Sequence, residues 1–453
     1  MRLGTSINAW RRAHAGIEVW HERPRLNLAT LLAFVSLIAT AFAARAQNSV
    51  CTGERWLPPR ELRTREGYTV FLERPSIAPL RGELFLPAWP TNIYDSLGTV
   101  VWPLAPNKQP SSFAHIPLGV VLEKTGIARP VPWPQNIPAG PWLPIGVADD
   151  RGIAHVIWGS RDNKELPSTY MVRSLWYARF DGHRWSTPSR VLSTDGTVMW
   201  SSATVSPLVA QGHSLHLVVA IQGEGLRYVR FDRRGWTEQH VNIASGYMSY
   251  PRVAVLRAGR LVLLVEGALT RPPTPSVFGL HLTTSDDGGE SWSPLIQISS
   301  RDEAPPFDAR LLADERDVLY AFWYQQTDHE GDPATGVTLG GTPGRIYATQ
   351  SFDRGATWRP PTPTPLIDNA NELQVLLRPD HSVLAVVADG AGERMLISSW
   401  SSSWSPFTVI DAKPKPFNPS LGTDEAQRPF LTWGIRRTHD WLGTMARTLV
   451  ACR

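Results

Sequence analysis

The chain has 453 residues, of which 42% are hydrophobic and 19% are charged, with 19 tryptophans and 39 prolines. This composition favours short strands and turns over long exposed helices, and it argues against disorder through the body of the chain. The formal charge is +4, but residues 1–46 hold six arginines and two glutamates, so their removal leaves a neutral chain. A neutral chain lacks the positive charge that nucleic-acid binding requires.

Residues 1–46 have the features of an export signal. Several arginines precede the apolar run Leu26 to Ala43, and Ala44-Arg45-Ala46 supplies a small-x-small cleavage site. We therefore expect a mature domain of residues 47–453, exported to the periplasm or the cell exterior, with no membrane span after cleavage. The alternative is an uncleaved N-terminal anchor, because the apolar run approaches the lower length limit of a membrane span.

The mature chain contains an internal repeat with a period of roughly 40 to 65 residues. One unit, residues 145–188, has two apolar stretches around a turn, followed by a hairpin that reaches Trp185. Similar units follow at residues 206–236, 250–292, 307–358 and 373–404, and a looser one begins at Pro75. Four strands per unit are typical of a propeller blade, so we predict an all-β fold, a six- or seven-bladed β-propeller.

The last unit, residues 416–452, is one strand short, and the N-terminus supplies a match. Gly53-Glu-Arg-Trp56 resembles Gly182-His-Arg-Trp185, which closes a complete unit. We therefore predict that the N-terminal strand completes the last blade and closes the ring. This would bring together the only two cysteines, Cys51 and Cys452, in an oxidising compartment. A disulfide there would stabilise the fold by roughly 4 to 5 kcal/mol in the chain-entropy model; a lipidated Cys51 is the alternative.

Two segments share the pattern Ser-x-Asp-x-Gly-x-x-Trp. Its positions are Ser285, Asp287, Gly289 and Trp292 in the first copy, and Ser351, Asp353, Gly355 and Trp358 in the second. We expect a structural role: the aspartate satisfies turn amides, the glycine adopts a positive φ, and the tryptophan packs beneath the turn. The pattern matches the Asp-box, and the chain therefore resembles the sialidase (bacterial neuraminidase repeat) superfamily.

This resemblance implies a sialidase-like propeller with an arginine triad that binds a carboxylate, a tyrosine nucleophile assisted by a glutamate, and an aspartate acid/base. Arg74 is similar to the arginine of the family's first blade, and Arg252 and Arg310 would be the other two members. Structural ion pairs are the alternative role for Arg252 and Arg310. The family supplies its tyrosine late in the chain, but no tyrosine follows Tyr347. We therefore expect no strong sialidase activity.

A ligand site is expected on one rim of the propeller. Successive strands are antiparallel, so the starts of first strands and the ends of second strands share a rim, opposite the Asp-box hairpins. On this rim we expect Glu266 and Asp308 as candidate catalytic residues. Trp158 and Trp323 are candidate sugar-stacking residues that would act with the arginines. The alternative for both tryptophans is packing between blades.

Two functions follow from such a rim. One is an exported glycoside hydrolase that uses a pair of carboxylates on a glycan or glycoconjugate. The other is a non-catalytic propeller that binds a protein or peptide of the cell envelope or exterior. We expect a monomer without cofactor or metal; a Ca²⁺ site at Asp328, Glu330 and Asp332 is the alternative to an exposed acidic loop.

Overall fold

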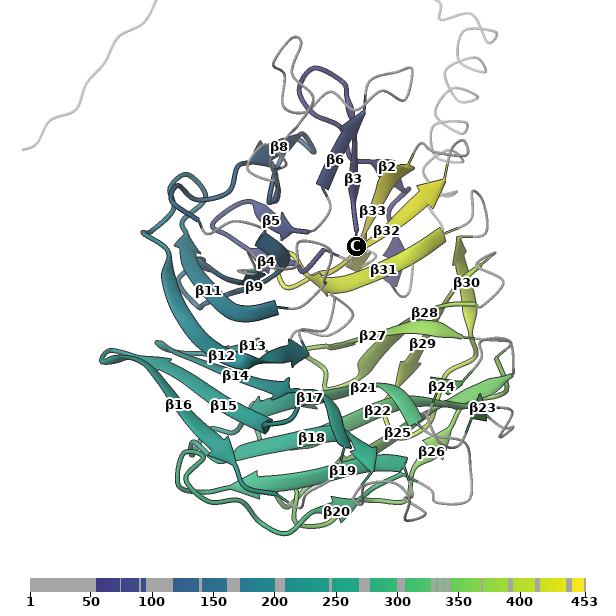
Figure 1. The fold of residues 1–453 in the computed structure, drawn as a ribbon. Coiled ribbons are helices and arrows are strands. Elements are labelled where there is room, and N and C mark those ends of the chain that lie inside the picture. Colours follow the sequence, from purple (N-terminus) through teal and green to yellow (C-terminus); the bar gives the residue numbers. More distant parts are fainter. Residues whose placement is uncertain are drawn as a thin grey trace, which may run out of the picture. The chain divides into compact units, whose positions relative to one another are not determined.

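The computed structural model describes residues 54–73, 75–88, 91–94, 117–137, 141–160, 172–199, 208–243, 247–268, 278–299, 306–326, 331–332, 337–338, 343–367, 370–389, 394–411, 416–436 and 442–451. These residues form an all-β structure of antiparallel sheets (Figure 1). Across these ranges, no helix is long and apolar enough to cross a membrane. Residues 55–450 belong to one compact unit; the other unit, residues 1–54 and 451–453, lies almost entirely outside the described ranges.

The strands of the predicted repeat units pair within four-stranded sheets, which we number in chain order. Sheet 1 contains β4 (Ala78–Pro79), β5 (Leu84–Pro87), β7 (Gly119–Leu122) and β8 (Ala128–Val131). Sheet 2 contains β9 (Pro141–Ala148), β10 (Ala154–Ser160), β11 (Val172–Phe180) and β12 (Ser189–Met199). Sheet 3 contains β13 (Leu208–Gln211), β14 (Ser214–Ile221), β15 (Gly225–Asp232) and β16 (Gly235–Val241). A short pairing of β12 with β14 joins sheets 2 and 3.

The second half of the chain continues the pattern. Sheet 4 contains β17 (Tyr247–Val255), β18 (Leu261–Ala268), β19 (Phe278–Ser285) and β20 (Ile296–Gln297). Sheet 5 contains β21 (Pro306–Ala313), β22 (Leu319–Gln326), β25 (Gly344–Ser351) and β26 (Thr362–Pro363). Sheet 6 contains β27 (Asn371–Leu377), β28 (Val383–Ala388), β29 (Met395–Trp400) and β30 (Thr408–Asp411). Two small two-stranded sheets lie apart from these: β3 (Thr69–Leu72) with β6 (Thr91–Tyr94), and β23 (Gly331–Asp332) with β24 (Val337–Thr338).

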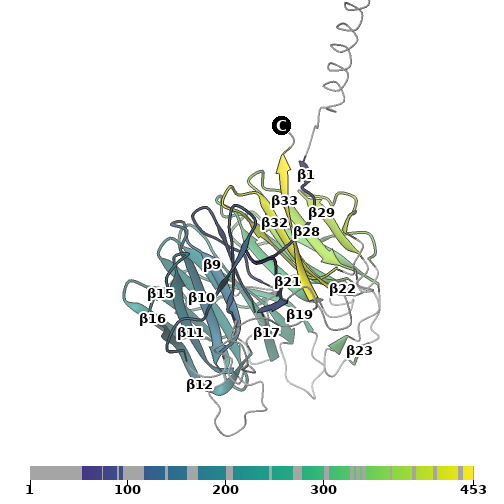
Figure 2. The same cartoon turned by 90° about the horizontal axis from the view of Figure 1, so that it is seen from above.

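The last sheet combines both ends of the described chain. Sheet 7 contains β31 (Pro416–Thr423), β32 (Pro429–Arg436), β33 (Leu442–Ala451) and, at its edge, β1 (Glu54–Trp56). Figure 2 shows β1 beside β33, and the backbone N–H of Leu57 donates to the carbonyl of Thr448 at 2.9 Å. The short β2 (Arg60–Glu61) also pairs with β33. The strand pairing predicted from the match between Trp56 and Trp185 is therefore present; Cys51 and Cys452 lie outside the described residues.

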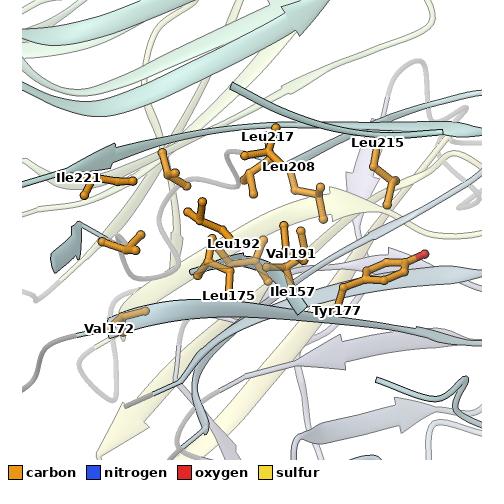
Figure 3. Packing of buried hydrophobic residues seen from close by; sticks show 14 residues of the cluster. Ile157, Val172, Leu175, Tyr177, Val191, Leu192, Leu208, Leu215, Leu217 and Ile221 are labelled. Carbon is orange, nitrogen blue, oxygen red and sulfur yellow. The ribbon is translucent and has the colours of Figure 1, made fainter. Parts of the chain in front are cut away.

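Hydrophobic clusters hold consecutive sheets together. The cluster between sheets 2 and 3 is drawn in Figure 3, where Leu175 and Leu192 face Leu208 and Leu217. Equivalent clusters join sheet 1 to 2, 3 to 4, 4 to 5, 5 to 6 and 6 to 7. A further cluster packs Phe430 of sheet 7 with sheet 1. Because each middle strand is covered on both faces, all eight residues of β22 are buried.

The hairpin tryptophans pack on the sheet that precedes their own. Ring centroids are separated by 5.9 Å for Trp185 and Phe85, 5.2 Å for Trp236 and Tyr177, 6.3 Å for Trp292 and Tyr228, and 6.0 Å for Trp404 and Phe322. Trp56 of β1 packs in the same way against the cluster of sheets 6 and 7. The N-terminal strand thus carries both the pairing and the packing that the outer hairpins of the repeat require.

Candidate functional site

The first strands of five sheets share a backbone irregularity near their starts. In β9, β17, β21, β27 and β31 the pairing with the second strand is interrupted by a β-bulge. A residue other than glycine has a positive φ at each bulge: Leu143 (44°), Tyr250 (45°), Asp308 (59°), Glu372 (60°) and Asn418 (50°). Bulges redirect side chains, and left-handed non-glycine residues are strained, so this repeated feature marks a candidate site. We call these five residues the mouth.

The bulges border a cavity of about 300 Å³. Its wall includes one or more residues from the first strand of every sheet, or directly before it: Ser76, Gly146, Val209, Arg252, Arg310, Gln374 and Ser420. In four sheets the lining residue lies two positions after a mouth residue. The mouth residues therefore belong to the strand starts that border a cavity shared by all seven sheets.

Arg252 and Glu266 hold the bulge of the next sheet. Glu266 is at the end of β18, and its Oε1 accepts a hydrogen bond from the backbone N–H of Ala309 at 3.0 Å. The Nε of Arg252 donates to the carbonyl of Ala309 at 3.1 Å. The peptide groups of Ala309 are thus bound by two side chains of sheet 4. Both side chains are buried, with exposed fractions of 5% for Arg252 and 3% for Glu266.

Arg310 and Asp308 connect sheets 5 and 6. The Nη1 of Arg310 donates to the carbonyls of Asp308 and Ala309, each at 3.0 Å. It also forms an ion pair with the Asp308 carboxylate at 3.4 Å. The other carboxylate oxygen of Asp308 accepts from the backbone N–H of Leu373 at 2.8 Å. Hydrogen bonds therefore link the bulges of β17, β21 and β27 in series.

Burial controls the electrostatics of this cluster. It raises the pKa of Glu266 to about 7, although Arg252 and the Ala309 amide favour the carboxylate. Burial also lowers the pKa of Arg252 to about 9 and lowers the pKa of Arg310, against the attraction of Glu266 and Asp308. Arg252 therefore remains charged at neutral pH, and the pKa of Glu266 lies close to neutrality.

The structure describes some of the site residues predicted from the sequence and leaves others undescribed. The structure brings together Arg252, Glu266, Asp308 and Arg310. Arg74 lies outside the described residues, as do Asp328 and Glu330, and only the backbone of Asp332 is described, in β23.

The predicted sugar-stacking role of two tryptophans is wrong. Trp158 and Trp323 have exposed fractions of 0%, so neither indole can contact a ligand. Trp158 packs edge-on against Trp133 between sheets 1 and 2, and Trp323 stacks on Tyr347 in the cluster of sheets 4 and 5. Their place in the middle of a sheet covered on both faces explains this burial.

Sequence reasoning gave no binding role to four mouth residues: Leu143, Tyr250, Glu372 and Asn418. Tyr250 is exposed by 46%, an unusual value for an aromatic side chain beside buried arginines. The available signal was the alignment of repeat units, because in four of the five strands the mouth residue lies two positions before the residue that lines the cavity. The amino-acid composition does not indicate that a tyrosine or a glutamate will adopt a left-handed conformation.

The Asp-box hairpins have the predicted structural geometry. The Ser285 hydroxyl donates to Asp287 Oδ1 and accepts from the Gly289 amide, both at 2.8 Å. Ser351, Asp353 and Gly355 repeat these bonds at the same distances. Gly289 and Gly355 have φ of 99° and 90°, and hydrogen bonds from their own hairpins lower the pKa of both aspartates.

Two other features of the structure contain grouped charged side chains. A pocket of about 320 Å³ between sheets 1 and 7 contains Asp424, but this carboxylate is paired with Arg428 at 2.7 Å. Among the described residues, one group could hold a metal ion: Asp314, Glu315 and His381. Asp314 already accepts bonds from Arg316 and from the amide of Val318 in its own turn. Both features are explained by local ion pairs and turn geometry.

Comparisons with known proteins place the fold but not the activity. The sequence matches no protein-family model and no curated protein. Similar solved structures include a fungal alcohol oxidase of the AA5 family in complex with copper, 10% identical with a TM-score of 0.51, over 87% of this chain and 76% of that one. A Dyadobacter fermentans protein of unknown function is 13% identical, with a TM-score of 0.46, over 88% and 100% of the two chains.

Sialidases are also among the similar structures. Trypanosoma rangeli sialidase is 12% identical with a TM-score of 0.41, and the alignment covers 72% of this chain and 56% of that one. This chain therefore spans about half the length of that sialidase. At these identities the likeness concerns the all-β fold alone.

Proposed function

We propose that the protein is a sialidase-like β-propeller of seven blades that binds a glycan at the mouth. The observation that carries this proposal is the convergence of five bulged first strands on one cavity, with side chains at strained backbone positions. The seven sheets, the seven clusters between them and the pairing of β1 with β33 support a closed ring. Ring closure also supports the proposed bond between Cys51 and Cys452, which non-reducing peptide mapping of the mature protein would reveal.

The side chains of the mouth suit a carbohydrate. Tyr250 offers an exposed aromatic face on which the C–H groups of a sugar ring can stack. Glu372 and Asn418 offer a carboxylate and an amide group for the directed hydrogen bonds of sugar hydroxyls. The export signal expected in residues 1–46 would place this site outside the cytoplasm, where glycans are abundant.

Binding is favoured over hydrolysis. A glycosidase needs one carboxyl group that exchanges protons and a second that acts as nucleophile or base. Glu266 and Asp308, the candidate pair, instead accept backbone amides of Ala309 and Leu373 and hold neighbouring sheets in register. We therefore assign both as positioning residues of a binding site.

A glycan array and a set of fluorogenic glycosides, including a sialoside, test this proposal on the mature protein. We expect glycan binding without turnover, and at least a tenfold loss of affinity in Tyr250→Ala, because an aromatic contact is lost. Phe352→Ala is the matched control, since Phe352 is 56% exposed on an Asp-box hairpin. Equal loss in both variants, or turnover of a glycoside, would contradict the proposal.

A further inference from the structure

The charged groups beneath the mouth have no excess of positive charge, even without a ligand. Arg252 and Arg310 are buried, and the carboxyl groups of Glu266 and Asp308 act electrostatically on both. Glu372 acts on Arg310 as well. Two positive groups therefore face three acidic ones, and the cluster carries no net positive charge. An incoming anion would meet carboxylates as well as guanidinium groups.

The arginine donors are largely engaged by the protein backbone. Arg252 uses Nη1 for the carbonyls of Tyr250 and Pro251, in addition to its bond to Ala309. Arg310 uses Nη1 for two bulge carbonyls. An anion that bound through Nη1 of either arginine would have to displace these bonds and leave buried carbonyls unsatisfied, which is costly. Nη2 of Arg310 already donates to Asp308 Oδ1 at 3.4 Å.

The other half of the cavity offers neutral polar groups. The residues equivalent to Arg252 and Arg310 are Gln374 in β27 and Ser420 in β31. Ser420 is 4% exposed, and its hydroxyl has no hydrogen-bond partner within the described part of the chain. A hydroxyl that is buried, unpartnered and set in a cavity wall requires a polar neighbour, which a ligand hydroxyl or water can supply.

We propose that the site selects neutral, polyhydroxylated sugars and rejects sugars that carry a carboxylate or a sulfate. This inference rests on the proposed glycan-binding function. It assigns Arg252 and Arg310 to holding the bulges, in contrast to the carboxylate-binding triad that resemblance to sialidases implies. Glu372 becomes a specificity-determining residue, because its carboxylate adds a further negative charge to a cluster in which two arginines already face two carboxyl groups.

The test compares matched sugars on the mature protein: galactosides against galacturonides, glucosides against glucuronides, and each neutral glycan against its sulfated form. We expect neutral members to bind at least tenfold more tightly, since a single like charge in a partly buried site costs on the order of that factor. Glu372→Gln should reduce the ratio of the affinity for neutral sugars to the affinity for acidic sugars by roughly three- to tenfold. Glu290→Gln, on an exposed Asp-box hairpin, should leave it unchanged.

The possible outcomes distinguish a failure of the proposed selectivity from a failure of the proposed glycan binding. A preference for acidic sugars, or an unchanged preference in Glu372→Gln, would overturn the selectivity while leaving glycan binding intact. Binding of no sugar in the panel would overturn the proposed function itself. Circular dichroism of both variants at the assay temperature shows whether a lost preference reflects the site or the fold.

Discussion

The two ends of the strands differ in the residues that adopt left-handed backbone conformations and in the hydrogen bonds that these residues make. At the Asp-box end Gly289 and Gly355 are left-handed, as is Arg354 (φ 60°), and each Asp-box aspartate bonds within its own hairpin. At the mouth the left-handed positions are occupied by Tyr250, Asp308 and Glu372, and the Asp308 carboxylate accepts a hydrogen bond from the next sheet. The Asp-box hairpins repeat one set of local hydrogen bonds, whereas the mouth residues differ from sheet to sheet. This contrast supports a structural role for the Asp-box end and the proposed binding site at the mouth.

The largest change in stability is expected at Trp323, which lies between the two ends of the strands. The sequence pattern predicts that this buried tryptophan lies in the ligand site. Trp323→Ala should lower the free energy of unfolding by about 4 kcal/mol, because it opens a cavity in the cluster between sheets 4 and 5. Urea unfolding at pH 7 measures this loss, and sugar affinity of the folded fraction should be unchanged. Lost affinity at full stability would restore a ligand-binding role for Trp323.

A smaller, pH-dependent effect is expected at the mouth. The pKa of Glu266 is raised from 4.5 to about 7 by burial, so the folded state binds its proton more tightly than the unfolded state does. Its contribution to stability is therefore complete below pH 4.5 and is lost as the pH rises to 7. Glu266→Gln keeps an acceptor for the Ala309 amide and cannot ionise.

Between pH 5 and pH 8, the stability of Glu266→Gln relative to the parent should consequently rise by about 2 kcal/mol. Unfolding free energies at several pH values provide the measurement. Glu290→Gln, exposed at the Asp-box end, should show no such trend. A flat difference for both variants would mean that Glu266 is ionised throughout this range.

The smallest expected changes in stability have opposite signs at the mouth and at the Asp-box end. Tyr250→Gly relieves a left-handed tyrosine and should raise stability by about 0.5 kcal/mol while weakening sugar binding. Gly289→Ala should lower stability by about 1 to 2 kcal/mol and leave binding intact. An alanine Cβ there would lie 2.5 Å from Cδ1 of Tyr228. Melting temperatures of the two variants test this, and a loss of stability in Tyr250→Gly would show that the mouth is unstrained.

Much of the fold was predictable because its determinants are local. Ser285 to Trp292 encode a complete hairpin, and the match between Trp56 and Trp185 identified the strand that joins the last sheet. The grouping of Arg252, Glu266, Asp308 and Arg310 was also accessible, since antiparallel order alone places strand starts and strand ends on one rim. The burial of Trp158 and Trp323 was not, because a tryptophan at a strand end can face either a neighbouring sheet or solvent.

The sequence by itself determined the all-β class, the four-stranded repeat, the Asp-box turns and the contribution of the N-terminal strand to the last sheet. These features follow from side-chain periodicity and from hydrogen bonds within a few residues. Only the tertiary structure decided which side chains come together at the candidate site, because the bulges of β21 and β27 are held across sheet boundaries by Glu266, Arg252 and Asp308. The left-handed conformations of Tyr250 and Glu372 are likewise disfavoured locally, so local sequence preferences do not predict them.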